Sequence, residues 1–378
     1  MYFSRFNYIS DYEKDEQRLL LNFLSRSCDI VDNESALHFS EQKGVSAEEK
    51  EYALQRGYIF QDESGELILL QKLYRDTLEN RRVLSVVCLD TFDGKGLKEV
   101  LKKIKNDNQF ILLSEHLLDN PVPFDYLDPS LKPHIITIYE NIPVFDLLFM
   151  KNAVSKVSLI VPLLDSVRFM EDIESRIDAL VEYGTPVEII VRIQKNEVQN
   201  LKPLMNYFIY KGWPFLENFT CNLEPTPNEG CIFGRWYGNA DLARQVFREY
   251  AVHPQTEFCS MQNWVGVNPI HSLIWTGKPS HPSFHFCEAF KGLTAMRGDG
   301  EVPCPHMGTD EFEAENAPDC LMCAYALTCG GGCKLKSKLK AEERCPPVKE
   351  LIEASLEYYF DEFLQRIHFH EQYYGGIQ

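Results

Sequence analysis

The run Cys320-Leu-Met-Cys323-Ala-Tyr-Ala-Leu-Thr-Cys329-Gly-Gly-Gly-Cys333 carries four cysteines at the spacing Cys-x2-Cys-x5-Cys-x3-Cys. Two more cysteines, Cys287 and Cys304, precede the run, and Cys345 follows it immediately before a proline. Iron–sulfur clusters take up to four thiolates at such spacings, and a Cys-Pro step commonly closes the set. The run therefore predicts a metal-bearing domain in the last quarter of the chain.

Two other uses of clustered cysteines have to be weighed. Structural disulfides form in oxidising compartments, but Met1–Ser10 lacks the charged and apolar regions of a secretory signal, so we expect a cytoplasmic protein. Zinc suits a Cys-x2-Cys pair, yet zinc ribbons usually carry a second such pair about 15–20 residues on. This chain has a single pair. Five cysteines are scattered elsewhere and are expected to be buried thiols: Cys28, Cys88, Cys221, Cys231 and Cys259.

The composition is that of a globular protein with more than one core. The chain has 378 residues, 44% of them hydrophobic, which favours two or three domains. A formal net charge of −18 opposes binding to nucleic acid or to an anionic membrane through a general basic field. The longest apolar stretches, such as Val157–Leu164, are too short to span a bilayer. We therefore expect neither a nucleic-acid nor a membrane partner.

The middle of the chain alternates short apolar segments with amphipathic ones, a pattern that indicates parallel strands joined by helical crossovers. The expected strands are Val83–Leu89, Phe110–Leu113, Ile135–Tyr139, Val157–Val161, Val187–Ile193 and Phe219–Leu223. The expected helices are Leu97–Ile104, Pro143–Lys151, Phe169–Tyr183, Val198–Lys211 and Ala240–Tyr250. These strands are too few for a closed eight-stranded barrel. We predict an α/β fold with an open, partial (β/α)6 barrel.

Three domains follow from these patterns. Residues 1–80 mix short strands and helices and predict a small α+β domain, with a hairpin over Tyr58–Leu70. Residues 81–255 contain the expected partial barrel. Residues 256–378 contain the clustered cysteines and a closing helix over Val348–Phe369, which two prolines precede.

Six βα units followed by this cysteine order resemble the radical SAM enzymes that carry a C-terminal SPASM domain, a branch that matures peptides and proteins. That signature has a first cysteine, a Gly-plus-Cys element, the four-cysteine run and a last cysteine. Here these are Cys287, Gly300 with Cys304, the run itself and Cys345, with Gly300 one residue closer to Cys304 than usual. The likeness of the barrel is looser and rests on Val187–Leu201. Residues 1–80 are similar to the leading segment of such maturases, which can resemble a peptide-recognition winged helix.

The motifs that serve S-adenosylmethionine (SAM) are absent from the sequence. In the family, a Cys-x3-Cys-x2-Cys motif after the first barrel strand holds a cluster whose open iron is chelated by SAM. The corresponding loop, Leu89–Gly96, contains no cysteine, and Cys88 lies alone inside the strand. The Gly-Gly-Glu element expected after the second strand is replaced by Leu113-Ser114-Glu115-His116. We therefore expect a degenerate member, a pseudoenzyme in which SAM has no site.

The resemblance implies one complete and one incomplete [4Fe–4S] cluster. The ligands of the complete cluster would be Cys320, Cys323, Cys329 and Cys345. The second cluster would take Cys287, Cys304 and Cys333, with Leu293 where a fourth ligand is expected. Three explanations stay open: Cys259 or His306 completes the set, the open iron binds substrate, or the second cluster is absent. The glycines 330–332 can turn backbone N–H groups toward cluster sulfurs, or simply form a tight turn.

Three functions are compatible with this pattern. The first is a partner, substrate-binding or electron-relay subunit in the maturation of a ribosomal peptide or protein, beside an active radical SAM protein. The second is an independent enzyme that uses an open cluster or the barrel mouth, which needs convergent acid/base groups at the strand ends. The candidates there are Asp90, Asp93, Glu115, Glu140, Asp165, Arg192 and Glu224. The third is a structural, metal-bearing interaction scaffold.

Overall fold

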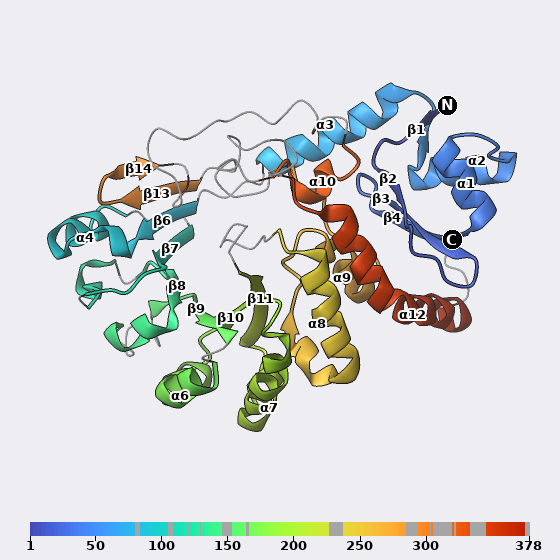
Figure 1. Cartoon of the computed structure of the whole chain (residues 1–378). Helices are drawn as coiled ribbons and strands as arrows, with labels where there is room; N and C mark the ends of the chain where they lie inside the picture. The colour runs from blue at the N-terminus through green and yellow to red at the C-terminus, as the bar shows by residue number, and fades with distance from the viewer. Residues whose placement is uncertain are drawn as a thin grey trace.

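Figure 1 shows a computed structural model of the chain, in which an N-terminal domain and a group of C-terminal helices lie beside a curved sheet. The structure describes residues 1–79, 84–104, 109–119, 121–128, 130–145, 153–163, 166–226, 237–284, 293–302, 304, 320, 323–332 and 345–374. Five of the residues singled out above lie outside these ranges: Asp165, Cys231, Cys287, His306 and Cys333.

The N-terminal domain combines short antiparallel strands with three helices. Strand β3 (Gln17–Asn22) lies between β2 (Asn7–Ile9) and β4 (Ser27–Asp32). A second pair is formed by β1 (Tyr2–Phe3) and β5 (Ile59–Phe60). The helices are α1 (Asn33–Glu41), α2 (Ala47–Arg56) and α3 (Glu63–Glu79). This part of the chain is therefore mixed α and β.

Side-chain caps determine where two of these helices begin. Asp32 accepts a hydrogen bond from the Ser35 N–H at 2.7 Å and starts α1. Ser46 and Glu49 form a capping box at α2, in which each side chain accepts from the other's backbone N–H, at 3.2 and 2.7 Å. Helix α2 ends at Gly57, whose φ of 75° suits a residue without a Cβ.

The hairpin predicted over Tyr58–Leu70 is wrong, because helix α3 begins inside it. Asp62, expected at the turn, instead accepts from the Gly65 N–H at 3.3 Å, as a helix N-cap does. Gly65 lies in the first turn of the helix, where the missing side chain weakens the helix less than it would in the middle. The Asp-Glu-Ser-Gly sequence was a helix start that resembled a turn.

The main sheet has nine strands in the order β12-β11-β10-β9-β8-β7-β6-β13-β14. The six strands predicted from the sequence are confirmed, in sequential order and all parallel. They are β6 (Leu84–Cys88), β7 (Gln109–Ser114), β8 (His134–Ile138), β9 (Lys156–Pro162), β10 (Val187–Ile193) and β11 (Phe219–Pro225). Their residues are buried along almost the whole length, as expected of parallel strands that are covered on both faces.

The crossover helices lie on the outer side of the curved row of strands (Figure 1). They are α4 (Gly94–Leu101), α6 (Ser166–Glu182), α7 (Leu201–Lys211) and α8 (Ala240–Val252). After β8 the chain forms a 3-10 turn, Tyr139–Val144, instead of starting the helix expected from Pro143. The rest of that expected helix lies largely outside the described residues. The structure is thus a mixed α/β fold whose sheet is mostly parallel.

Residues that follow position 255 complete the sheet at both of its edges. Strand β12 (Cys259–Ser260) pairs with β11 in parallel. At the other edge β13 (Leu293–Arg297) pairs with β6 in parallel, and β14 (Gly300–Val302) pairs with β13 antiparallel. The segment that carries the cysteines is therefore anchored to the same sheet as the barrel-like strands.

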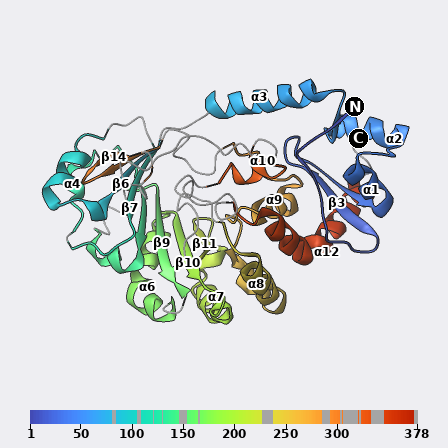
Figure 2. The same cartoon turned by 45° about the horizontal axis from the view of Figure 1, so that its top comes forward.

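The C-terminal helix α12 (Val348–Tyr374) packs against α8 and α9 (Val267–Thr276), and both views place it next to the N-terminal domain (Figure 1 and Figure 2). It begins directly after two prolines, as predicted. Gly266 makes the close approach possible, because a Cβ there would lie 2.3 Å from the Cβ of Leu351. Helix α12 is thus buried between other elements along much of its length.

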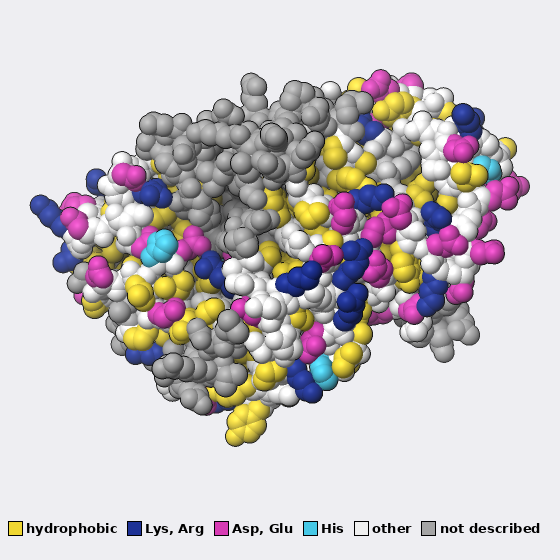
Figure 3. All heavy atoms as spheres, viewed as in Figure 1, with side chains coloured by type: hydrophobic (Ala, Val, Ile, Leu, Met, Phe, Trp, Pro, Cys, Tyr) yellow, Lys and Arg dark blue, Asp and Glu magenta, His cyan; other side chains and the backbone are white. Residues whose placement is uncertain are grey.

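Charged side chains of both signs lie on the described surface (Figure 3). On the face drawn in Figure 3, Lys and Arg side chains are interleaved with Asp and Glu. Within the described ranges, no helix combines the length and the hydropathy that a membrane crossing needs.

Candidate functional site

The described part of the cysteine run folds as two tight turns. The Cys323 N–H donates to the Cys320 carbonyl at 3.3 Å, and the Ala326 N–H donates to the Cys323 carbonyl at 3.1 Å. A single helical turn, α10 (Ala326–Cys329), follows, and Cys329 is buried. These turns and the helical turn connect the first three cysteines of the run.

Three consecutive glycines then take the left-handed conformation. Gly330, Gly331 and Gly332 have φ values of 63°, 80° and 76°. Such a succession is sterically accessible to glycine and strained for any other residue. Burial raises the pKa of the Cys329 thiol to about 11, although a hydrogen bond from the Gly331 N–H acts in the opposite direction and lowers it. The glycines therefore direct a backbone donor at a cysteine sulfur, as the sequence suggested they could.

The four cysteines expected to share a cluster lie near one another. Cys323, Cys320 and Cys345 are each close enough to Cys329 to raise its pKa further. Within the described residues, however, no group of three His, Cys, Asp or Glu side chains is arranged to hold a single metal ion. The donor set, four thiols and an N–H aimed at sulfur, suits an iron–sulfur cluster, provided that the side chains move together around it.

Two candidates for the second cluster, Cys259 and Cys304, lie next to opposite edges of the main sheet, whereas Cys287 and Cys333 lie outside the described residues. Cys259, one proposed fourth ligand, points at Cys221 on the neighbouring strand, with a distance of 2.9 Å between the two Sγ atoms. Cys304 is buried just beyond β14 and lies close to Cys88 at the end of β6. Burial, followed by the Asp90 carboxylate, raises the pKa of Cys88 to about 12, and Cys304 adds to the effect. This proximity was not predicted; it arises because β13 pairs with β6.

The loop after β6, where a radical SAM enzyme would carry its cysteines, is organised by carboxylates. Asp90 Oδ2 accepts hydrogen bonds from the N–H groups of Glu115 and His116, both at 3.2 Å. Asp93 accepts from the Gly96 N–H at 2.6 Å and caps α4. Asp90 therefore links the loops after β6 and β7, the two loops that lack the SAM motifs.

The turn of the β13–β14 hairpin packs directly on this loop. The Gly298 N–H donates to Thr91 Oγ1 at 3.0 Å. A Cβ at Gly298 would lie 2.0 Å from the Thr91 carbonyl oxygen, so glycine is required for the close approach. The segment that carries the cysteines thus covers the loop at the end of the first barrel-like strand.

Three of the seven candidates at the strand ends converge. Arg192 at the end of β10 donates through Nε to Glu224 Oε2 at 2.8 Å and through Nη2 to Glu115 Oε1 at 3.2 Å. The Glu224 side chain is fully buried. Burial alone would lower the pKa of Arg192, but the two carboxylates raise it. The carboxyl ends of the strands, which we call the mouth of the sheet, therefore hold the Arg192 cation between two carboxylates. This arrangement is suited to positioning a substrate and not to general-base catalysis.

Three other candidates, Asp90, Asp93 and Glu140, do not join this cluster. Asp90 and Asp93 bind backbone N–H groups, as described above. Glu140 is exposed in the 3-10 turn after β8, and Asp165 lies outside the described ranges.

A second polar layer, which the sequence did not reveal, crosses the sheet near the amino ends of the strands. Ser158 Oγ lies 2.8 Å from His134 Nε2 and donates to Glu188 Oε2 at 2.5 Å. The other Glu188 oxygen accepts from Asn222 Nδ2 at 2.6 Å, and Lys156 Nζ lies 2.7 Å from Oε2. Burial, and then Lys156, lower the pKa of His134 to about 4. This imidazole is therefore neutral at pH 7.

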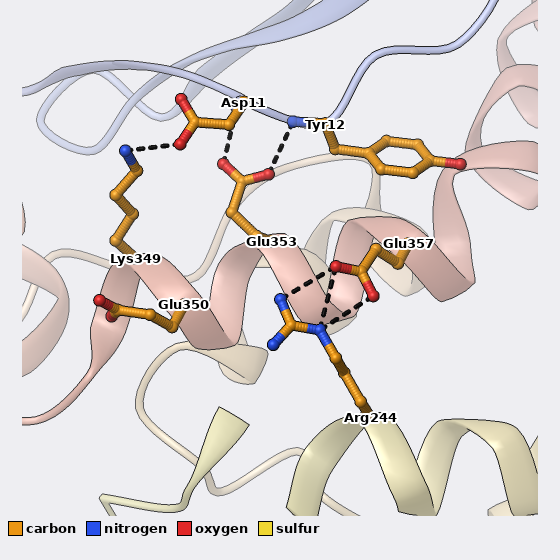
Figure 4. A pocket seen from close by; sticks show the side chains of 7 residues that line it. All are labelled: Asp11, Tyr12, Arg244, Lys349, Glu350, Glu353 and Glu357. Atoms are coloured by element: carbon orange, nitrogen blue, oxygen red, sulfur yellow. Dashed lines mark hydrogen bonds and ion pairs between the residues drawn. The ribbon is translucent and has the colours of Figure 1, made fainter. Parts of the chain in front are cut away.

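The N-terminal domain is bound to α12 through one buried carboxylate, shown in Figure 4. Glu353 accepts from the backbone N–H groups of Asp11 and Tyr12, both at 2.8 Å, and from the Tyr8 hydroxyl. Lys349 pairs with Asp11 at 2.6 Å beside a cleft of about 390 Å³. Because α12 follows Cys345 after only two prolines, the domain is attached close to the expected cluster.

Comparisons with known proteins give structural similarity alone. No family model matches the chain, and no curated protein matches it. It is similar to anSMEcpe with bound AdoMet, with a TM-score of 0.48 and 12% identity over 75% of this chain and 99% of that one. For the same protein with bound AdoMet and the Cp18Cys peptide, the TM-score is 0.47 and the identity 13%, over 76% of this chain and 99% of that one. For SuiB of Streptococcus suis, the TM-score is 0.43 and the identity 15%, over 92% of this chain and 99% of that one. At TM-scores below 0.5, function has to be inferred from the residues of this chain.

Proposed function

We propose that the chain is an iron–sulfur protein of the SPASM type, with a radical SAM-like partial barrel as its scaffold. Its role is that of a partner, substrate-binding or electron-relay subunit in the maturation of a ribosomal peptide or protein. The observation that carries this proposal is the gathering of Cys320, Cys323 and Cys345 around Cys329, with the Gly331 N–H directed at the Cys329 sulfur. Thiolates and backbone donors in this arrangement are what an iron–sulfur cluster requires.

The four cysteines would hold one [4Fe–4S] cluster, which supplies one-electron transfer when bound. The chain's own contribution is to position the thiolates and to limit the access of water. Burial protects Cys329, and the left-handed glycines provide N–H groups that stabilise negative charge on sulfur. Cys304 and the residues 287 and 333 are proposed as ligands of a second, incomplete cluster.

SAM cleavage is assigned to a partner protein and not to this chain. The loop after β6 contains no cysteine, and Asp90 and Asp93 use their carboxylates to bind backbone N–H groups there. A cytoplasmic complex with an active radical SAM protein would supply the missing chemistry.

The N-terminal domain is proposed as the peptide-binding part. Buried Glu66 fixes α3 by accepting from Ser4 Oγ at 2.6 Å and from Arg5 Nε at 2.8 Å. On the opposite side of the same helix, Ile68 is 66% exposed and Leu67 is 38% exposed. A helix held rigidly at one residue while it presents apolar side chains suits recognition of a peptide.

A peptide array tests this binding role. We expect peptides that bind the intact protein to lose binding in Ile68→Asp and to keep it in Tyr210→Asp, a matched change at a residue of α7 that is 85% exposed. Equal binding by both variants would exclude α3 as the peptide site.

A second candidate function is an independent enzyme acting at the mouth of the sheet, and the convergence of Glu115, Arg192 and Glu224 favours it. Because Arg192 is already paired with two carboxylates, these residues would orient a substrate instead of exchanging protons with it.

Metal analysis tests whether the chain is an iron–sulfur protein or a zinc-bearing scaffold. Iron, acid-labile sulfide and zinc are measured on anaerobically purified protein, with Cys320→Ala/Cys323→Ala as the test variant and Cys28→Ala on β4 as control. We expect about four irons with equal sulfide per chain, or about eight if both clusters form. Only the test variant should lose them. Stoichiometric zinc without sulfide would exclude electron transfer and leave an interaction scaffold.

A further inference from the structure

Two buried cysteines face each other outside the expected cluster sites. Cys221 on β11 and Cys259 on β12 are direct partners in parallel register, and their Sγ atoms are 2.9 Å apart. Neighbouring strands lie about 4.8 Å apart, inside the range of Cα separations, about 4.4–6.8 Å, that disulfides span. The two sulfurs therefore need to approach each other by less than an ångström, about the difference from a 2.05 Å bond, to become linked.

A cavity lies beside one of the two cysteines. Its volume is about 150 Å³, and Cys221 lines it together with Ser260 and Gln262 from the chain around β12. Thr220 and Phe258, which also line it, are exposed, so the cavity opens to solvent. Cys259 itself is fully buried, behind Cys221.

The geometry points to a reversible disulfide between Cys221 and Cys259, formed by exchange with a small-molecule disulfide that enters this cavity. The Cys221 thiolate attacks the reagent, RSSR, and releases one thiol, RSH. The Cys259 thiolate then attacks the mixed disulfide and releases the second RSH. Two electrons pass from the cysteine pair to the reagent, and the two thiol protons go to the departing thiolates.

The consequence concerns the edge of the sheet. The Tyr250 hydroxyl donates to the Cys259 carbonyl and ties β12 to α8, so the backbone around Cys259 is already fixed. A disulfide would link the short edge strand covalently to the last of the six predicted strands. In that state Cys259 could not serve as a ligand of the second cluster, and the linkage does not depend on whether a cluster is present.

The first experiment treats the anaerobically purified wild-type protein with 2-hydroxyethyl disulfide, a reagent small enough to enter the cavity. Free thiols are then alkylated, and the protein is digested with Glu-C and chymotrypsin, which separate Cys221 and Cys259 from every other cysteine in the sequence. We expect a linked peptide pair that a dithiol reductant separates. Burial raises the pKa of Cys221 well above its ordinary value, so linkage should be about 30-fold faster at pH 8.5 than at pH 7. Recovery of both cysteines as free thiols after prolonged exposure at pH 8.5 would overturn the proposal.

Single variants test the order of the steps. In Cys259→Ser, the first exchange has no resolving thiol, so Cys221 should accumulate as a mixed disulfide with 2-mercaptoethanol. In Cys28→Ser, the linked pair should form as in the wild type. Accumulation of the mixed disulfide at Cys221 in the wild type would show that the pair does not close. If Cys259→Ser fails to fold, the wild-type peptide map still decides the question.

Discussion

The two ends of the parallel sheet both carry a buried basic side chain, which is charged at one end and neutral at the other. At the carboxyl ends Arg192 remains charged, because Glu224 and Glu115 outweigh the cost of its burial. At the amino ends His134 is kept neutral by burial and by Lys156. Arg192 therefore keeps its positive charge across the ordinary range of pH, whereas His134 takes up a proton in acid. A constant positive charge suits a site that binds a substrate or a partner.

The largest effect on stability is expected from removing the Arg192 cation at the mouth of the sheet. Arg192→Met leaves Glu224 buried without the cation that faces it, which should cost about 3–5 kcal/mol in the free energy of unfolding by urea. Lys195→Met is the control, because its pair with Asp241 is exposed on both sides and should contribute at most about 1 kcal/mol. Equal losses in both variants would mean that the mouth is not held by this ion pair.

A smaller effect is expected at the other end when the pH falls. The pKa of His134 is about 4 in the folded protein and near 6.5 in the unfolded chain, so the unfolded state binds more protons between these values. Stability should therefore fall as the pH drops below 6.5, with a contribution of about 1–2 kcal/mol from this residue between pH 7 and pH 5.

Unfolding curves of His134→Gln test this assignment. The amide keeps a polar contact with Ser158 but does not titrate, so the pH dependence should flatten relative to the wild type. Arg192→Met, although less stable overall, should keep it. A His134→Gln curve with the slope of the wild type would assign the acid response to another group.

An effect no larger than that of His134 is expected from the loop that replaces the SAM motif. Asp90→Ala removes the acceptor for two backbone N–H groups and should cost about 1–2 kcal/mol. Asp90→Asn keeps an acceptor oxygen in the same place, so its loss should be clearly smaller. Thermal or urea unfolding distinguishes the two, and an equal loss would indicate that the charge, and not the hydrogen bonds, holds the loops together.

Regular elements were predictable where the apolar pattern repeats along the chain. Val187–Ile193 was assigned to its full length, because five of its seven residues are β-branched and apolar, with only Glu188 and Arg192 interrupting them. The hairpin over Tyr58–Leu70 failed because an Asp-Glu-Ser-Gly sequence suits a turn and a helix N-cap equally well. The β13–β14 hairpin was missed, since its five- and three-residue strands give too short a pattern.

The site was predictable residue by residue but not as an arrangement. Glu115, Arg192 and Glu224 were named because they follow strands, yet 77 residues separate Glu115 from Arg192, and only strand order brings them together. The same holds for Cys304 beside Cys88, and for Cys259, whose neighbour is Cys221 and not the expected cluster. Spacing in sequence indicates ligand type, while sheet topology determines which ligands meet.

The contact between Glu353 and the backbone of Asp11 also has a consequence for synthesis on the ribosome. These residues are 342 positions apart, so at about 5–20 residues per second roughly 17–70 seconds pass between their translation. Throughout that interval the N-terminal domain lacks its contact with Glu353 on α12. Glu353 can therefore bind the backbone of Asp11 only near the end of synthesis, long after the three-stranded sheet and the capped helices have been translated.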